Sequence, residues 1–120
     1  MKVTTEGHAY ELDQFESYGL EGCPVQKLQF IHKVPETQLT STEGLPNYGL
    51  PDANGLVTLT DGTTNEEVLK VMIHRMNYLQ NKFPCRENAI VITKLEESLM
   101  WLEKRTADRK ARNVEGKHIA

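Results

Sequence analysis

The chain has 120 residues, 38% of them hydrophobic and 26% charged, which is typical of one soluble globular domain and excludes a disordered chain. No apolar run approaches the roughly 20 residues that span a membrane, and the N-terminus lacks the apolar core of a secretion signal. A net charge of −3 argues against general affinity for long nucleic acids.

Residues 1–62 are predicted to form a β-rich part of this single domain, residues 1–120. Three segments alternate apolar and polar residues as strands do: His8–Phe15, Val25–Val34 and Gly55–Thr60. No helical pattern separates them, so we expect them to pair in an antiparallel sheet. His32 falls on the apolar side of the second segment, where a structural role is favoured over a ligand role.

Residues 35–54 are rich in Pro, Gly, Asn and Thr, and a loop of this length is unusual in a small domain. The segment is a β-ribbon tip, an arm that wraps a second subunit, or a lid. Tyr48 is predicted to be exposed there, and packing within the loop is favoured over contact with a ligand or a partner.

Residues 63–120 are predicted to form an antiparallel hairpin of two helices with a basic C-terminal end. Thr64 and Glu67 have the spacing of a capping box at the start of the first helix. The residues predicted to pack on the second helix are Val68, Leu69, Met72, Ile73, Met76 and Leu79. The first helix is expected to end near Gln80, and Phe83 and Pro84 form the corner.

The second helix is predicted to begin near Arg86 and to be apolar on more than one side. Its core stripe is Ile92, Leu95, Leu99 and Leu102, whereas Val91, Met100 and Trp101 lie off that stripe. The simplest cover for a second apolar face is another copy of the chain. The helices should span roughly 25 Å and 42 Å, so about ten residues overhang and either fray or pack beside another subunit.

Positive charge gathers at the end of this second helix. Residues 104–120 contain 6 basic and 2 acidic side chains, whereas residues 1–63 contain 3 and 9. Arg105, Arg109 and Arg112 have i, i+4, i+7 spacing and share one helical face. Their partner is either an acidic group, such as Asp108 or a carboxylate of another chain, or a phosphate held by the guanidinium groups. The residues alone slightly favour the acidic partner.

The hairpin corner carries a second group of candidate ligand-binding residues: Tyr78, Phe83, Arg86 and Asn88. An Asn side chain can read an adenine edge, and an aromatic or Arg plane can stack on a base. Structural readings also exist, with Phe83 plugging the corner and Asn88 filling the first helical turn. The corner lies far from the arginines of the same helix, so the two groups can meet only across a subunit interface.

Signals for an enzyme are poor, and we expect no catalytic residues, metal or cofactor. The histidines, His8, His32, His74 and His118, lack metal-ligand spacing. No phosphate-binding glycine loop of the P-loop type occurs, and the adjacent glutamate pairs point to different helical faces. Cys23 and Cys85 are expected to be reduced, with Cys85 partly buried near a helix start.

The segments REN, TKLEE, MW, RT-x-x-R and VEG follow one another between residues 86 and 116, after TTNEEVLKVMIHRMNYLQNKFPC. In this order, residues 63–118 resemble the phage family of Thoeris anti-defence and anti-CBASS nucleotide sponges. The resemblance implies an antiparallel sheet and a helical hairpin, assembled as dimers or hexamers in the host bacterial cytoplasm. It also implies non-catalytic sequestration of cyclic ADP-ribose isomers such as gcADPR, and in some members of cyclic oligonucleotides, so that immune effectors stay inactive.

The resemblance further assigns roles to matching positions. It implies that Tyr78 stacks on a base, that Asn88 reads a base or ribose, and that Arg105 and Arg109 clamp phosphates. The predicted ligand-binding set is completed by Phe83, Arg86 and Arg112. The alternative function is a non-catalytic phage interaction or assembly protein, whose arginine face binds an acidic protein surface.

Overall fold

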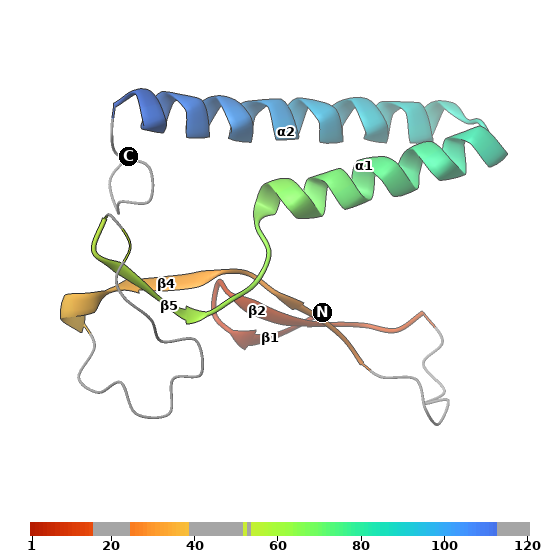
Figure 1. Ribbon diagram of the computed structural model, residues 1–120. Coiled ribbons are helices and arrows are strands. Elements are labelled where there is room, and N and C mark those ends of the chain that lie inside the picture. The colour runs from red at the N-terminus through yellow and green to blue at the C-terminus, as the bar shows by residue number, and fades with distance from the viewer. Residues whose placement is uncertain (16–24, 39–51, 53, 113–120) are drawn as a thin grey trace. The chain divides into compact units, whose positions relative to one another are not determined.

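The computed structural model of the chain describes residues 1–15, 25–38, 52 and 54–112 (Figure 1). Contacts divide the chain into two compact units, residues 1–63 and 64–120. The first contains antiparallel strands and the second two α-helices, which confirms the predicted α+β fold. That the two units form one domain stays a prediction. None of the helices in the described ranges is both long and apolar enough to cross a membrane.

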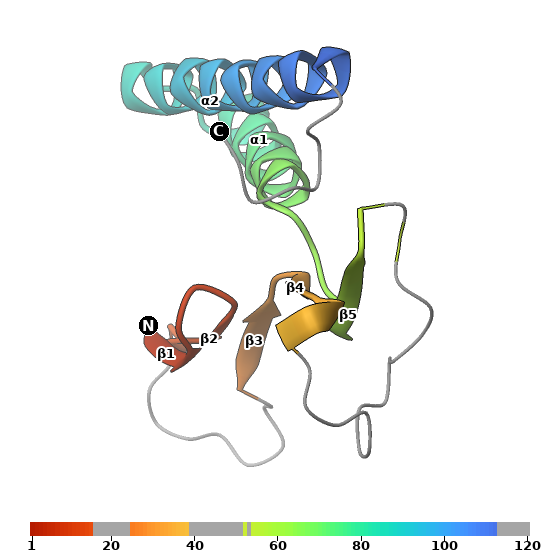
Figure 2. The same ribbon diagram turned by 90° about the vertical axis from the view of Figure 1, so that its left-hand side faces the viewer.

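The first unit contains two groups of antiparallel strands, seen from another side in Figure 2. A three-stranded sheet has the order β1 (Lys2–Thr5), β2 (Ala9–Leu12), β3 (Gln26–Gln29). A separate pair consists of β4 (His32–Pro35) and β5 (Leu56–Thr60), with the 3₁₀ turn Glu36–Gln38 after β4. Among the described residues of this unit, the buried side chains are Leu56 and Val57, both on β5, so the strand predicted as Gly55–Thr60 supplies the core seen there.

Two strand predictions need correction. Strand β1 was not predicted, because Lys2–Thr5 has a single large apolar residue and all four side chains are exposed. It is held at the sheet edge by backbone pairing with β2. The prediction of one continuous strand over Val25–Val34 is wrong, since it divides into β3 and β4. Apart from residues 35–38, 52 and 54, the predicted loop 35–54, including Tyr48, lies outside the described residues.

The break between β3 and β4 is caused by a change of hydrogen-bonding partner. The Phe30 amide donates to the His8 carbonyl at 2.7 Å, as a continuation of the first sheet. The next amide, Ile31, donates to the Thr63 carbonyl at 2.9 Å, and Thr63 donates back to Gln29 at 2.9 Å. Thr63, which follows β5, therefore pairs with Gln29 and Ile31. This pairing separates β3 from β4.

The start of β5 is fixed to β4 by the carboxylate of Asp52. Its Oδ1 accepts from the amides of Asn54 at 2.8 Å and Leu56 at 3.0 Å, while Lys33 Nζ donates to Oδ2 at 3.0 Å. These bonds favour the ionised form, so the pKa of Asp52 lies below its ordinary value of 3.8, chiefly through the Leu56 amide and then Lys33.

The second unit is a helical hairpin of α1 (Asn65–Lys82) and α2 (Arg86–Ala111). The predicted N-cap is confirmed, because the Thr64 hydroxyl accepts from the Glu67 amide at 3.3 Å. Helix α2 is capped by Cys85, whose Sγ accepts from the Asn88 amide at 3.4 Å. Cys85 is an exposed free thiol, so the prediction that it is partly buried is wrong.

Helices α1 and α2 diverge from their common corner (Figures 1 and 2). On α2 the predicted core stripe is confirmed, with Ile92 buried and Leu95, Leu99 and Leu102 half-buried. The α1 stripe is also half-buried, except for Met72, which is 39% exposed. The divergence explains why Ile92 is the one buried hydrophobic residue in the described part of the hairpin.

Candidate ligand-binding site

The three arginines near the end of α2 have different environments. Arg105 and Arg112 are exposed, whereas Arg109 is buried, with only 6% of its surface accessible. The predicted acidic partner Asp108 is paired with Lys104 instead, at 3.2 Å between Nζ and Oδ2. Within residues 54–112, no ion pair is formed by Arg105 or Arg112. Two cations are thus presented to solvent, and a third is set into the protein.

Helix α2 has 26 residues and α1 has 18, so α2 is eight residues longer, close to the predicted overhang of about ten, and Figure 1 shows it extending past the start of α1. Side chains of both helices line one hollow of about 400 Å³: Glu66 and Lys70 of α1, and Glu103, Thr106, Ala107 and Lys110 of α2. Glu66 and Lys70 of α1 therefore border the same hollow as residues 103–110 of α2. Helix α2 ends at Ala111, where the Arg112 amide donates to the Asp108 carbonyl. The predicted turn at residues 113–116 lies outside the described residues.

The residues of the hairpin corner are mostly solvent-accessible. Tyr78 is 53% exposed, and the ammonium group of Lys82 lies 5.2 Å from the centre of its ring. Phe83 is 74% exposed, so it does not plug the corner. Arg86 is exposed in the first turn of α2, whereas Asn88 is half-buried. All four side chains are accessible enough to contact a ligand.

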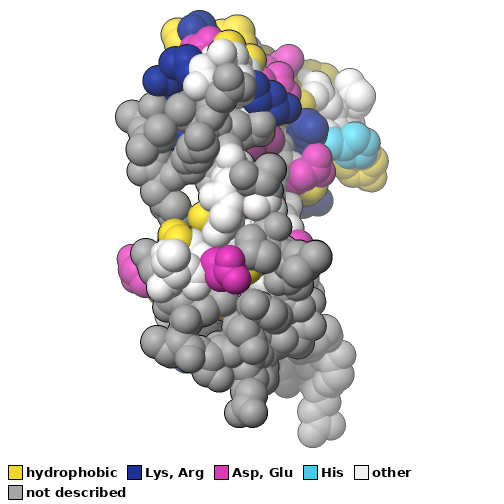
Figure 3. All heavy atoms as spheres, turned by 60° about the vertical axis from the view of Figure 1, so that its left-hand side comes forward, with side chains coloured by type: hydrophobic (Ala, Val, Ile, Leu, Met, Phe, Trp, Pro, Cys, Tyr) yellow, Lys and Arg dark blue, Asp and Glu magenta, His cyan; other side chains and the backbone are white. Residues whose placement is uncertain are grey.

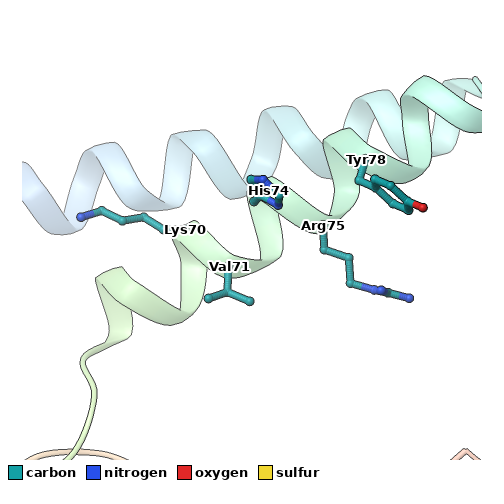
Figure 4. Close-up of a pocket in the computed structure, with 5 residues that line it drawn as sticks. All are labelled: Lys70, Val71, His74, Arg75 and Tyr78. Carbon is teal, nitrogen blue, oxygen red and sulfur yellow. The ribbon is translucent and has the colours of Figure 1, made fainter.

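Within one chain, Tyr78 and Arg86 line different hollows. Figure 4 shows the first, which is lined by α1 residues Lys70, Val71, His74, Arg75 and Tyr78. The second is lined by α2 residues Arg86, Ala89, Ile90, Thr93 and Lys94. The sequence reasoning missed the cations around Tyr78. Their signal was present, because Arg75 and Lys82 have the three- and four-residue spacing that places them with Tyr78 on one side of a helix.

The corner and the arginines lie at opposite ends of α2. Asn88 and Arg105 are about 25 Å apart along the axis at 1.5 Å per residue. A small ligand cannot contact both in one copy of the chain. The predicted ligand-binding residues therefore form two separate groups, and only the second copy expected from the sequence could unite them.

Apolar side chains of α2 are exposed on the sides that do not face α1. Ile90, Val91, Met100 and Trp101 are 44%, 40%, 55% and 58% exposed. Figure 3 shows hydrophobic side chains on the helical unit among Lys, Arg, Asp and Glu. The predicted second apolar face is thus exposed in the single chain, and its cover by another copy stays a prediction.

Groups suited to metal binding do not gather in the described part of the chain. No three His, Cys, Asp or Glu side chains lie close enough together there to hold an ion. His8 and His32 lie together, but their rings are stacked with planes 7° apart. Because the nitrogen lone pairs lie in the planes of these two parallel rings, they do not point at one common metal ion.

Comparison with known proteins gives a family model and a similar phage protein. Residues 48–107, half of the chain, match the family model described as the Acb2/Tad1 hairpin domain. The chain is also similar to Thoeris anti-defense 1 of Bacillus phage SBSphiJ7, with 58% identity over 59 residues. This match covers 48% of the chain and 42% of the relative's length. The family match includes all corner candidates and Arg105, and it ends before Arg109 and Arg112.

Proposed function

The chain belongs to the Acb2/Tad1 hairpin-domain family, and on this basis we propose that it is a phage anti-defence protein that sequesters cyclic nucleotide messengers. The ligands are cyclic ADP-ribose isomers such as gcADPR, with CBASS cyclic oligonucleotides as a further class. The protein holds the messenger intact in the host cytoplasm, so that Thoeris or CBASS effectors are not activated.

The observation that carries this proposal is the 58% identity to a phage Thoeris anti-defence protein. Arg105 and Arg112 add a chemical reason. A guanidinium group at Arg105 or Arg112 that lacks an acidic partner within the described residues is available for a phosphate, which it binds through two parallel hydrogen bonds. The same two arginines could also bind an acidic protein surface, as the alternative of an interaction or assembly protein requires, so the capture experiment below decides between the two.

The proposed site is shared between copies of the chain. Tyr78, Phe83, Arg86 and Asn88 of one hairpin corner receive the base and ribose, while Arg105, Arg109 and Arg112 of another copy hold the phosphates. The exposed apolar face with Met100 and Trp101 supports such an assembly, a dimer or hexamer, because burial of this face is favourable.

The contacts available are strong enough for a sponge. Hydrogen bonds to charged groups contribute roughly 1.5–3 kcal/mol each, and stacking of a base on an aromatic ring roughly 1–3 kcal/mol. Four to six such contacts in a preformed pocket reach about −12 kcal/mol after the costs of association, which corresponds to a nanomolar Kd. No bond of the ligand has to be broken for this function.

Capture and release of gcADPR tests the proposal. The protein is incubated with gcADPR, separated from free ligand and heat-denatured, and the released compound is identified by mass spectrometry. Recovery of intact gcADPR is the expected result. A chemically altered product would identify an enzyme, and failure to recover gcADPR or any member of a cyclic-oligonucleotide panel would leave the interaction-protein alternative.

A mixing experiment tests whether the site is shared. Asn88→Ala and Arg105→Ala are each expected to abolish capture and to keep the assembly size of the wild type. Co-expression of the two variants should restore part of the capture, because mixed assemblies contain some pockets with both intact groups. If the co-expressed variants capture nothing, both residues act in the same pocket half and the shared site is wrong.

A further inference from the structure

The turn that leads into β5 contains the single Asn-Gly step of the sequence, Asn54–Gly55. Both residues are exposed, and Gly55 has a φ of 76°, a backbone conformation that favours glycine. A Cβ atom built at Gly55 would meet no atom within 4 Å. The peptide unit between these two residues is therefore accessible to water and has space in which to rotate.

A second step of related chemistry, Asp61–Gly62, follows β5 and has different surroundings. A Cβ atom at Gly62 would lie 2.4 Å from the backbone oxygen of Gln29, so this glycine is packed against another segment. The side chains differ as well, because a nitrogen nucleophile attacks a negatively charged carboxylate far less readily than a neutral amide. Of the two steps beside β5, only Asn54–Gly55 combines a reactive side chain with open space.

We propose that Asn54 is a site of spontaneous deamidation, by which the strand unit, residues 1–63, ages in its folded state. The Gly55 backbone nitrogen loses its proton to hydroxide and attacks the side-chain carbon Cγ of Asn54. The N–Cγ bond forms, the Cγ–Nδ2 bond breaks, and ammonia leaves with a proton from water. The cyclic succinimide then adds water and opens to isoaspartate or aspartate. The net reaction consumes water, releases ammonia and involves no oxidant or reductant.

One hydrogen bond opposes the attack. The Gly55 amide donates to the Asp52 carbonyl at 3.0 Å, and this bond has to open before the nitrogen can approach Cγ. The opening of one such bond lowers the rate by about five- to tenfold. The turn therefore slows the reaction and does not prevent it.

Isoaspartate would alter the structure more than aspartate, because it lengthens the main chain by a methylene group between residues 54 and 55. Two hydrogen bonds span this point: the Leu56 amide donates to Asp52 Oδ1 at 3.0 Å, and the Asp52 amide donates to the Leu56 carbonyl at 2.9 Å. Leu56 and Val57, which are buried, follow directly. The longer main chain should therefore displace the start of β5 and destabilise the strand unit.

Ageing of the full chain in native buffer tests the proposal. The protein is incubated at physiological temperature in mildly alkaline buffer and digested, and mass spectrometry follows the exchange of NH₂ for OH at each asparagine. Asn77 and Asn81 are internal controls, because both lie within α1 and are followed by large side chains. Asn54 should react at least about tenfold faster than either control. Equal rates at the three positions would overturn the proposal.

The same incubation in urea separates a reaction of the folded protein from one of the unfolded chain. The rate at Asn54 in native buffer should lie within about tenfold of the rate in urea, as the opening of one hydrogen bond implies. A reaction that is detected in urea and is absent from native buffer would show that the turn protects Asn54, and the proposal would be wrong.

Two variants assign the structural effect. Asn54→Gln keeps an amide whose longer side chain closes a ring far more slowly, so position 54 should not age. Asn54→Asp adds the charge of the product without lengthening the main chain. The isoaspartate fraction, separated by chromatography, should have an unfolding equilibrium constant about five- to tenfold larger than that of Asn54→Asp, as the loss of one backbone hydrogen bond implies. Equal stability of these two species would overturn the displacement of β5.

Discussion

The imidazole rings of His8 and His32 are stacked, with centroids 3.7 Å apart and planes 7° apart. His8 lies in the turn between β1 and β2, and His32 begins β4, so the stack joins the three-stranded sheet to the β4–β5 pair. Burial lowers the pKa of His32 from its ordinary value of 6.5, and the charge of His8 lowers it further.

This stack predicts that the strand unit loses stability on acidification. The folded state binds a proton at His32 less readily than the unfolded state, so the contribution of His32 is complete above about pH 6.5 and is lost as the pH falls below that value. Thermal unfolding at about pH 7.5 and about pH 5.5 should show a larger decrease for the wild type than for His32→Phe, which keeps an aromatic ring and cannot be protonated.

His74→Phe is the matched control for this measurement, because His74 is exposed on α1. It should retain the acid sensitivity of the wild type. An equal loss of stability in the wild type and His32→Phe would show that other groups cause it.

Gly62 is expected to tolerate no side chain. A Cβ atom at this position would lie 2.4 Å from the backbone oxygen of Gln29 and 2.7 Å from the carbonyl carbon of Phe30. Both are backbone atoms held by the pairing of β3 with Thr63, so they cannot move aside cheaply. Gly62→Ala should lower the free energy of unfolding by about 1–3 kcal/mol in urea denaturation.

Asp61→Ala provides the comparison at the neighbouring position. It removes the exposed carboxylate that accepts from the Gly62 amide at 2.9 Å and adds no atom near Gln29. Its effect should stay within about 0.5 kcal/mol, as for most surface substitutions. If both variants unfold at the same urea concentration, the close approach at Gly62 does not limit stability.

Substitution of Arg105 should affect ligand capture alone, whereas substitution of Arg109 should affect both capture and stability. Arg109 is buried, so Arg109→Ala removes packed aliphatic and polar atoms together and should cost about 1–3 kcal/mol of stability in addition to ligand capture. Arg105 is exposed, and Arg105→Ala should unfold within about 0.5 kcal/mol of the wild type while capture is lost. Urea denaturation and gcADPR capture, measured on the same preparations, give both quantities. Arg109→Ala with wild-type stability would show that its burial contributes nothing to the fold.

The helical hairpin could be predicted from the sequence because its signals are local. The Thr64 cap and the apolar spacing of α1 and α2 lie within a few residues of the structure they specify. The division of the strand Val25–Val34 could not be predicted in this way. It depends on hydrogen bonds from Ile31 to Thr63, far along the chain, and the alternation of side chains continues through the break.

The residues of the candidate site could be proposed from the sequence, but their burial and arrangement could not. The spacing of Arg105, Arg109 and Arg112 places them on successive turns, but spacing alone does not distinguish a buried arginine from an exposed one. Arg75 and Lys82 were missed because a cation on a surface helix is usually a solvated residue. The structure shows that Arg75 lines a hollow with Tyr78 and that Lys82 lies over the Tyr78 ring.

Two hydrogen bonds between the Gln80 side chain and the Cys85 backbone close the corner of the hairpin. The Gln80 side chain donates to the Cys85 carbonyl and accepts from the Cys85 amide, both at 3.0 Å, so one amide group imitates a pair of backbone bonds. Phe83, between these two residues, takes no part in the closure and is 74% exposed. The closure of the corner and its exposed aromatic surface therefore belong to different side chains within six residues. A substitution at position 83 should therefore leave the hairpin closed, because both bonds of the closure belong to Gln80 and Cys85.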